Sequence, residues 1–71
     1  MAFTIRMLYK TELAQAYGIS VSTLIKMIES TRIYLKKNNN GKDILGPTKG
    51  RRLLTIKQVT YITEHNGKPD E

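Results

Sequence analysis

Basic side chains are the residues of this sequence that point most clearly to a chemistry, and they are clustered. Residues 32–57 hold eight lysines and arginines against one acid, Asp43, whereas residues 1–31 carry a net charge of +1 and residues 58–71 carry −2. The eight are Arg32, Lys36, Lys37, Lys42, Lys49, Arg51, Arg52 and Lys57. A block of positive charge attracts polyanions, of which nucleic acid is the commonest. Charge alone leaves two interpretations open, a contact with nucleic acid and a merely solubilising surface.

The sequence contains no evident catalytic set. It has one histidine, His65, and no cysteine, so the usual ligands of a zinc site and a cysteine nucleophile are both missing. No acid–base pair, nucleophile–base pair or phosphate-binding loop is apparent. A chain of 71 residues buries only about 60% of its unfolded surface, which leaves little room for an enclosed pocket. We therefore expect a non-enzymatic protein that forms one domain, residues 1–71, without a metal or cofactor.

Two short helices should precede most of the basic block. Leu13, Ala14 and Tyr17 lie three and four residues apart, which predicts a helix from about residue 10 to Tyr17. Gly18 follows at the position where a helix commonly ends in a left-handed residue, a conformation that glycine adopts without steric cost. The first helix should therefore stop at this glycine.

The second helix has Ser20 as a favourable N-cap and an expected end near Glu29. Its apolar residues cluster on one side at about 100° per residue. They are Val21, Leu24, Ile25, Met27 and Ile28. Two such helices joined through Gly18 have the dimensions of a helix-turn-helix over residues 10–29. The small side chain of Ala14 suits the point where the two helices would cross.

The region from residue 33 to residue 54 allows several local structures. A tight turn at Asn40-Gly41 would pair residues 33–35 with residues 44–45 as a hairpin. A turn over 46–50 would instead pair residues 44–45 with residues 52–54. A short helix over the four residues before Gly46 is a third possibility. The sequence does not choose among the three.

Each end of the chain adds one further element. Apolar residues at positions 3, 5 and 7 alternate with polar ones, which predicts a short half-buried strand or an extended arm. Near the other end, Thr55 and Gln58 have the spacing of a capping box. A third helix should follow, at about residues 56–65, and bury Val59 and Ile62.

Two stretches of the chain resemble known bacterial DNA-binding proteins. The run Glu12-Leu13-Ala14-Gln15-Ala16-Tyr17-Gly18-Ile19-Ser20-Val21-Ser22-Thr23-Leu24 is similar to the pattern E-L-A-x-x-x-G-[VI]-S-x-S-T-[VIL] of bacterial helix-turn-helix proteins. The run Arg51-Arg52-Leu53-Leu54-Thr55, followed by Gln58-Val59, resembles the winged helix of MerR-type regulators and phage excisionases. It is also similar to short bacterial proteins that end in a T-x-x-Q-V-x-x-I and G-x-P pattern.

The resemblance implies a winged helix-turn-helix, mainly α with a small β-hairpin and three helices, whose wing lies at about residues 33–54. Its implied partner is double-stranded DNA, with the second helix in the major groove. Ser20 and Thr23 would then hold phosphates, while Ser22, Lys26 and Glu29 would read base edges. Glu29 can also pair with Arg32 three residues on. The residues implied to contact the flanking backbone or enter a minor groove are Lys36, Lys37, Lys42, Lys49, Arg51 and Arg52.

Two functions fit this resemblance, a transcription regulator and an excisionase-like recombination directionality factor. A single module buries only about 600–1,000 Å² on DNA, which favours several copies on adjacent sites and hence the excisionase-like role. The alternative is a protein-interaction adaptor that uses the helix-turn-helix as a scaffold. Without a signal peptide or an apolar run of membrane-spanning length, we expect a cytoplasmic protein.

Overall fold

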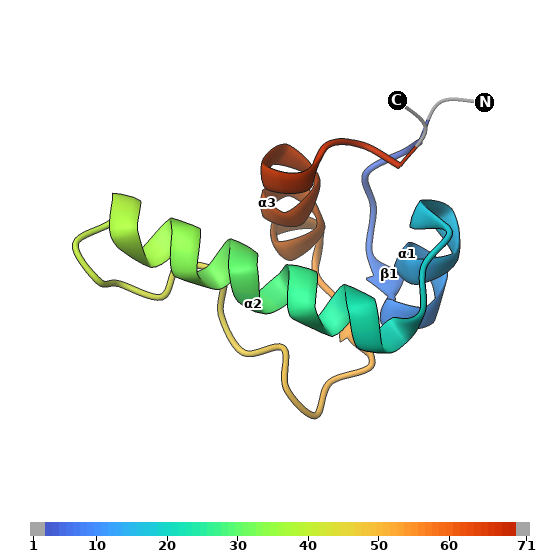
Figure 1. The fold of residues 1–71 in the computed structure, drawn as a ribbon, viewed down its shortest axis with the longest axis horizontal. Coiled ribbons are helices and arrows are strands. Elements are labelled where there is room, and N and C mark those ends of the chain that lie inside the picture. Colours follow the sequence, from blue (N-terminus) through green and yellow to red (C-terminus); the bar gives the residue numbers. More distant parts are fainter. Residues whose placement is uncertain (1–2, 70–71) are drawn as a thin grey trace.

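Three helices and two short strands make up residues 3–69, the part of the chain described by the structure, a computed structural model (Figure 1). In chain order they are β1 (Leu8–Tyr9), α1 (Lys10–Tyr17), α2 (Val21–Asn38), β2 (Leu53–Leu54) and α3 (Ile56–Asn66). The two strands form one antiparallel sheet. The predicted fold class, mainly helical with a small antiparallel β element, is therefore confirmed.

The junction between α1 and α2 forms as predicted. Gly18 has a φ of 71° and its N–H donates to the carbonyl of Gln15 at 3.0 Å, so α1 ends in a left-handed residue. The Ser20 side-chain oxygen accepts a hydrogen bond from the Thr23 N–H at 3.2 Å and caps α2. Leu24, the first fully buried residue of α2, belongs to the shared core. The two capping hydrogen bonds each span only three residues, which is why the local sequence specifies them.

Helix α2 is much longer than predicted, because it continues past Glu29 to Asn38. The buried stripe that starts with Leu24 and Ile28 is extended by Thr31 and Leu35 at the same helical spacing. The Thr31 hydroxyl donates to the Met27 carbonyl at 2.8 Å, so this polar residue is satisfied inside the helix. The prediction of a strand over residues 33–35 is therefore wrong.

The Asn-Gly pair ends a helix and does not form a hairpin. Asn40 and Gly41 have φ values of 56° and 82°, and the Gly41 N–H donates to the Lys36 carbonyl at 2.8 Å. These two left-handed residues satisfy the last turn of α2. Within the described chain, residues 42–52 contain neither a helix nor a strand, so both predicted hairpins and the short helix before Gly46 are wrong.

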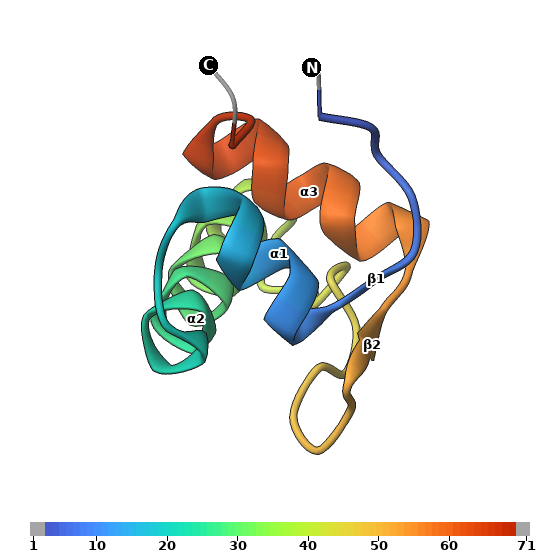
Figure 2. The same cartoon turned by 90° about the vertical axis from the view of Figure 1, so that its right-hand side faces the viewer.

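The strand partner of β2 comes from the N-terminal arm. Leu8 pairs with Leu54 and Tyr9 pairs with Leu53, in antiparallel register. Leu8 and Leu54 are 3% and 0% exposed, so the pairing also buries two leucines. Residues 3–7 have no strand of their own and run as an extended arm along the helices (Figure 2).

Helix α3 closes the core from the other side. Thr55 and Gln58 form the predicted capping box, with backbone-to-side-chain distances of 3.2 and 3.0 Å. Val59 and Ile62 are fully buried, as predicted. The Tyr17 hydroxyl donates to the Gly67 carbonyl at 2.6 Å, and burial raises the pKa of Tyr17. None of the helices within residues 3–69 is long and apolar enough to cross a membrane.

Candidate nucleic-acid interface

The first turns of α2 present a polar surface. Ser22 and Lys26 are exposed, and they lie one turn apart on the side of α2 away from the Leu24 stripe. The hydroxyls of Ser20 and Thr23 lie 3.0 Å apart at the start of the helix. One of them donates to the other, so one hydroxyl proton stays available for an outside acceptor. This end of α2 can therefore donate both hydroxyl and ammonium hydrogen bonds.

Glu29 is the one acid on this surface, and its carboxylate is oriented by a neighbour. It lies 3.7 Å from the Nε of Arg32, with 55% of its side chain exposed. The predicted pairing of these two residues is confirmed. The ion pair leaves the carboxylate open to solvent, so Glu29 can still accept a hydrogen bond from a bound molecule.

Arg32 links α2 by hydrogen bonds to residues 43–52, the segment that we name the wing loop. Its Nη1 donates to a carboxylate oxygen of Asp43 at 2.6 Å and to the Gly46 carbonyl at 2.8 Å. Its Nη2 donates to the Thr48 hydroxyl at 2.7 Å. The Arg32 side chain is only 14% exposed, whereas that of Asp43 is 38% exposed. The guanidinium therefore lies between the helix and the wing loop.

Electrostatics favours the ionised form of Asp43. Partial desolvation acts to raise the pKa of this carboxyl. The hydrogen bonds from Arg32 and from the Gly46 N–H, with the positive charges of Arg32 and Lys36, outweigh it and lower the pKa below the ordinary value of 3.8. Asp43 is therefore a carboxylate at neutral pH.

Two further helices hold the same loop. The Nε2 of Gln58 in α3 donates to the carbonyls of Leu45 and Pro47, both at 3.1 Å. The Nζ of Lys10 in α1 donates to the Thr48 carbonyl at 2.6 Å. We name the three side chains Lys10, Arg32 and Gln58 the loop clamp. Because each comes from a different helix, they fix the wing loop relative to the whole helical core.

The clamped loop carries three exposed cations; Lys49 lies beside α2, and Arg52 lines a hollow with Lys10 and Thr11 of α1. Figure 2 shows the loop projecting from the helices just before β2. We name the cations, Lys49, Arg51 and Arg52, the wing cations; all three are exposed. A cavity of about 410 Å³ separates the loop from α2. Its lining residues are Lys10, Ile25, Ile28, Glu29, Thr48, Lys49 and Gly50. Glu29 and Lys49, both predicted site residues, thus face one cavity.

The other predicted cations lie elsewhere. Lys36 and Lys37 are in the last turn of α2 and Lys42 follows in the turn after it, all exposed. We name them the helix-end cations. At about 1.5 Å per residue, Lys36 is roughly 20 Å along the helix from Ser22. Figure 1 shows this end of α2 extending away from α1 and α3. The structure therefore divides the predicted basic surface into two groups.

The loop clamp is the part of the site that sequence reasoning missed. The sequence predicts no role for Lys10. It predicts Arg32 only as a positive charge or a partner of Glu29, and Gln58 only as part of a helix cap. One feature of the sequence points to these contacts: Asp43 is the single acid in the basic block. A lone carboxylate among cations favours a specific internal partner.

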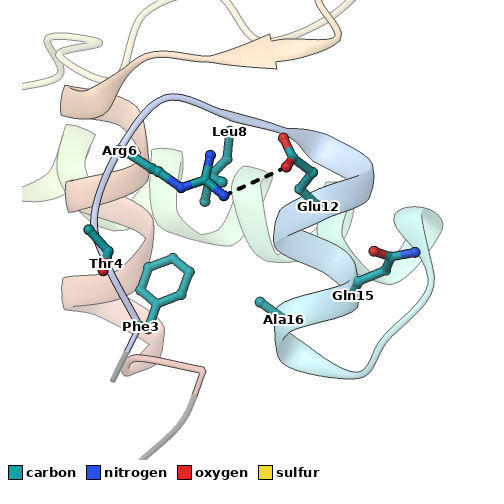
Figure 3. Close-up of a pocket in the computed structure, with 7 residues that line it drawn as sticks. All are labelled: Phe3, Thr4, Arg6, Leu8, Glu12, Gln15 and Ala16. Carbon is teal, nitrogen blue, oxygen red and sulfur yellow. Dashed lines mark ion pairs between the residues drawn. The ribbon is translucent and has the colours of Figure 1, made fainter. Parts of the chain in front are cut away.

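A second hollow lies on the opposite side of α1, between that helix and the N-terminal arm (Figure 3). It measures about 480 Å³ and is lined by Phe3, Thr4, Arg6, Leu8, Glu12, Gln15 and Ala16. Arg6 and Glu12 form an ion pair of 3.7 Å across it, drawn as a dashed line in Figure 3. The Glu12 carboxylate also accepts from the Tyr9 N–H at 3.0 Å, which ties the arm to the start of α1. These contacts hold the N-terminal arm against α1 at this hollow.

Comparison of the chain with protein-family models, with curated proteins and with solved structures gave no match.

Proposed function

We propose that this protein binds double-stranded DNA, with the N-terminal half of α2 in the major groove and the wing cations on the flanking backbone. The observation that carries the proposal is the shared cavity, which sets Glu29, a candidate base reader, opposite Lys49, a candidate phosphate ligand. A major groove about 12 Å wide admits one helix, so an element beside that helix meets the groove edge. The wing loop occupies that position relative to α2.

Each group has a chemistry that suits duplex DNA. Lys26 can donate to the guanine edge, and Glu29 can accept from a cytosine amine. The free hydroxyl proton of Ser20 or Thr23 can donate to a phosphate, at a helix start where backbone N–H groups also favour anions. The exposed Ile25, which lines the same cavity as Glu29, can contact a thymine methyl.

The test is binding of the full chain to short labelled duplexes across a range of salt concentrations. Every phosphate contact adds about 0.9 to the slope of log affinity against log salt, so three wing cations should contribute roughly 2.7. A competition between random and selected sequences then measures specificity. An affinity that does not depend on salt, or no binding at low salt, would remove DNA as the partner.

Within this function, we favour an excisionase-like architectural role in a bacterial cytoplasm, with several copies on adjacent sites, over that of a stand-alone transcription regulator. The support is the small size of the module, because one copy covers little DNA. Footprinting of increasing protein concentrations distinguishes the two roles. Adjacent protected sites would support the architectural role, and one isolated palindromic site would support a regulator.

A protein-interaction adaptor is the second candidate. The observation that favours it is the pair of large exposed side chains Ile33 and Tyr34 on α2, which are 58% and 48% exposed. An adaptor would show no preference among DNA sequences, and its chemical shifts at Ser22, Lys26 and Glu29 would not change when DNA is added.

A further inference from the structure

The wing loop is irregular in backbone but closely held by side chains. Residues 43–50 belong to no strand or helix, yet the loop clamp donates six hydrogen bonds to residues 43–48. Half of these come from Arg32. Thr48, which accepts from both Arg32 and Lys10, is only 3% exposed. The wing cations follow directly after this held segment.

We infer that Arg32 is a positioning residue of the DNA-binding surface, which fixes the wing cations relative to Glu29 and contacts no phosphate itself. This inference rests on the proposed function. It separates Arg32 from the other cations of the basic block, which are exposed and have no such partners among the described contacts.

The hydrogen-bonding capacity of Arg32 is nearly used up inside the protein. A guanidinium has five N–H donors, and three serve Asp43, Gly46 and Thr48 while the Nε faces Glu29. Two carboxylates within 4 Å, those of Asp43 and Glu29, also offset its charge. A phosphate would have to displace these partners to bind Arg32. Its charge should therefore not contribute to the salt dependence of DNA binding.

The contacts of Arg32 use the shape of its guanidinium. Nη1 donates to Asp43 and Gly46 and Nη2 donates to Thr48, whereas a lysine would have to donate from one nitrogen at the end of its side chain. In Arg32→Lys the charge would remain but the loop would lose contacts at Gly46 or Thr48. The same Arg32 side chain also faces Glu29. One residue therefore contacts both the wing loop and the candidate base reader.

A preformed loop makes binding tighter because it does not have to be ordered when the complex forms. Loosening the loop should therefore weaken binding by roughly threefold to tenfold. The salt slope should stay unchanged, because the number of phosphate contacts in the complex is the same. A lost phosphate ligand would behave differently, since both the affinity and the slope would fall.

Asp43→Asn gives the sharpest test, because the alternatives predict opposite signs. If only charge matters, removing a negative charge from a basic surface tightens DNA binding. If the Arg32 contacts matter, the same change weakens binding and loosens the loop. Glu64→Gln is the matched control, since Glu64 is an exposed acid of α3 outside the loop clamp. It removes the same charge and should leave the loop unchanged.

The experiment measures two quantities for the parent, Asp43→Asn, Arg32→Lys and Glu64→Gln. The first is the hydrogen exchange and 15N relaxation of residues 44–52 in the free protein, with the Arg51 N–H, which donates to the Thr48 carbonyl at 3.2 Å, as the reporter. The second is the affinity for duplex DNA across salt concentrations. We expect faster exchange in the loop and weaker DNA binding for Asp43→Asn and Arg32→Lys, but not for Glu64→Gln. The slope of log affinity against log salt should not change.

Three outcomes would overturn the inference. The first two are an unchanged loop in Asp43→Asn and tighter DNA binding by that variant. The third comes from one additional variant, Arg32→Met, measured in the same salt series: a slope lower by about 0.9 would make Arg32 a phosphate ligand. If the parent itself binds no DNA, the proposed function fails and the positioning role fails with it. The loop measurement then still shows whether the Arg32 contacts hold the loop in the free protein, so the two failures are distinguishable.

Discussion

The wing cations and the helix-end cations have the same charge but different surroundings. The wing cations follow a segment held by three helices, and Lys49 shares a cavity with Glu29. The helix-end cations lie at the far end of α2, roughly 20 Å along the helix from Ser22. Three positive charges therefore lie in a clamped loop in the first case and at a helix end in the second. Position relative to the start of α2, and not charge, distinguishes the two groups.

The largest expected effect comes from removing the wing cations. In Lys49→Ala/Arg51→Ala/Arg52→Ala, the salt slope should fall by about 2.7 and the affinity near physiological salt by on the order of 100-fold. The unfolding midpoint should change little, because all three side chains are exposed. Fluorescence anisotropy against salt, with a thermal melt of each variant, provides the measurement. An unchanged slope would mean that these cations do not contact the DNA backbone.

A single substitution at the start of α2 should act on specificity. Lys26→Ala should cost about 1–3 kcal/mol on a preferred site and relax the preference at one base position, if Lys26 donates to a base edge. Site selection with the parent and the variant compares the two preferences. A uniform loss on all sequences would instead assign Lys26 to a phosphate.

The matched counterpart of the wing variant is Lys36→Ala/Lys37→Ala/Lys42→Ala. It removes the same charge, but we expect a fall in slope of less than about 0.9, the value of a single phosphate contact. The same anisotropy series measures it. Equal losses in the two triple variants would show that the division into two groups has no functional meaning.

The smallest expected effect is the loss of the stabilising contribution of Asp43 at low pH. Because the pKa of folded Asp43 lies below 3.8, its contribution to stability is present above that pH and is lost as the pH falls through the folded value. The Gly46 N–H, which donates to Asp43 at 3.3 Å, reports this by its chemical shift in an acid titration. We expect a midpoint below 3.8, and a higher midpoint would mean that Arg32 does not hold the carboxylate.

The sequence predicted the parts of the fold that depend on near neighbours. Gly18 and Ser20 act through hydrogen bonds across five residues or fewer, and their residue types specify them. The continuation of α2 was missed because the buried stripe passes through Thr31, a polar residue that hides the helical period. The Asn40-Gly41 pair that follows α2 is typical both of a tight hairpin turn and of a helix end. The sequence alone does not tell which of the two structures forms.

The candidate site was predicted in composition but not in arrangement. All the exposed cations could be named from the sequence, yet their division into two groups follows from the unexpected length of α2. The contacts of the loop clamp join residues far apart in the sequence: Asp43 lies 11 positions after Arg32, and Thr48 lies 38 positions after Lys10. A single sequence carries no local pattern for such pairs.

The central claim is that the start of α2 and the wing cations meet DNA together. An NMR titration of the 15N-labelled chain with a duplex, at two salt concentrations, tests it most directly. We predict shift changes at residues 20–29 and 49–52 that weaken steeply at the higher salt, with smaller changes at residues 36–42. Changes confined to residues 36–42, or none at low salt, would contradict the account.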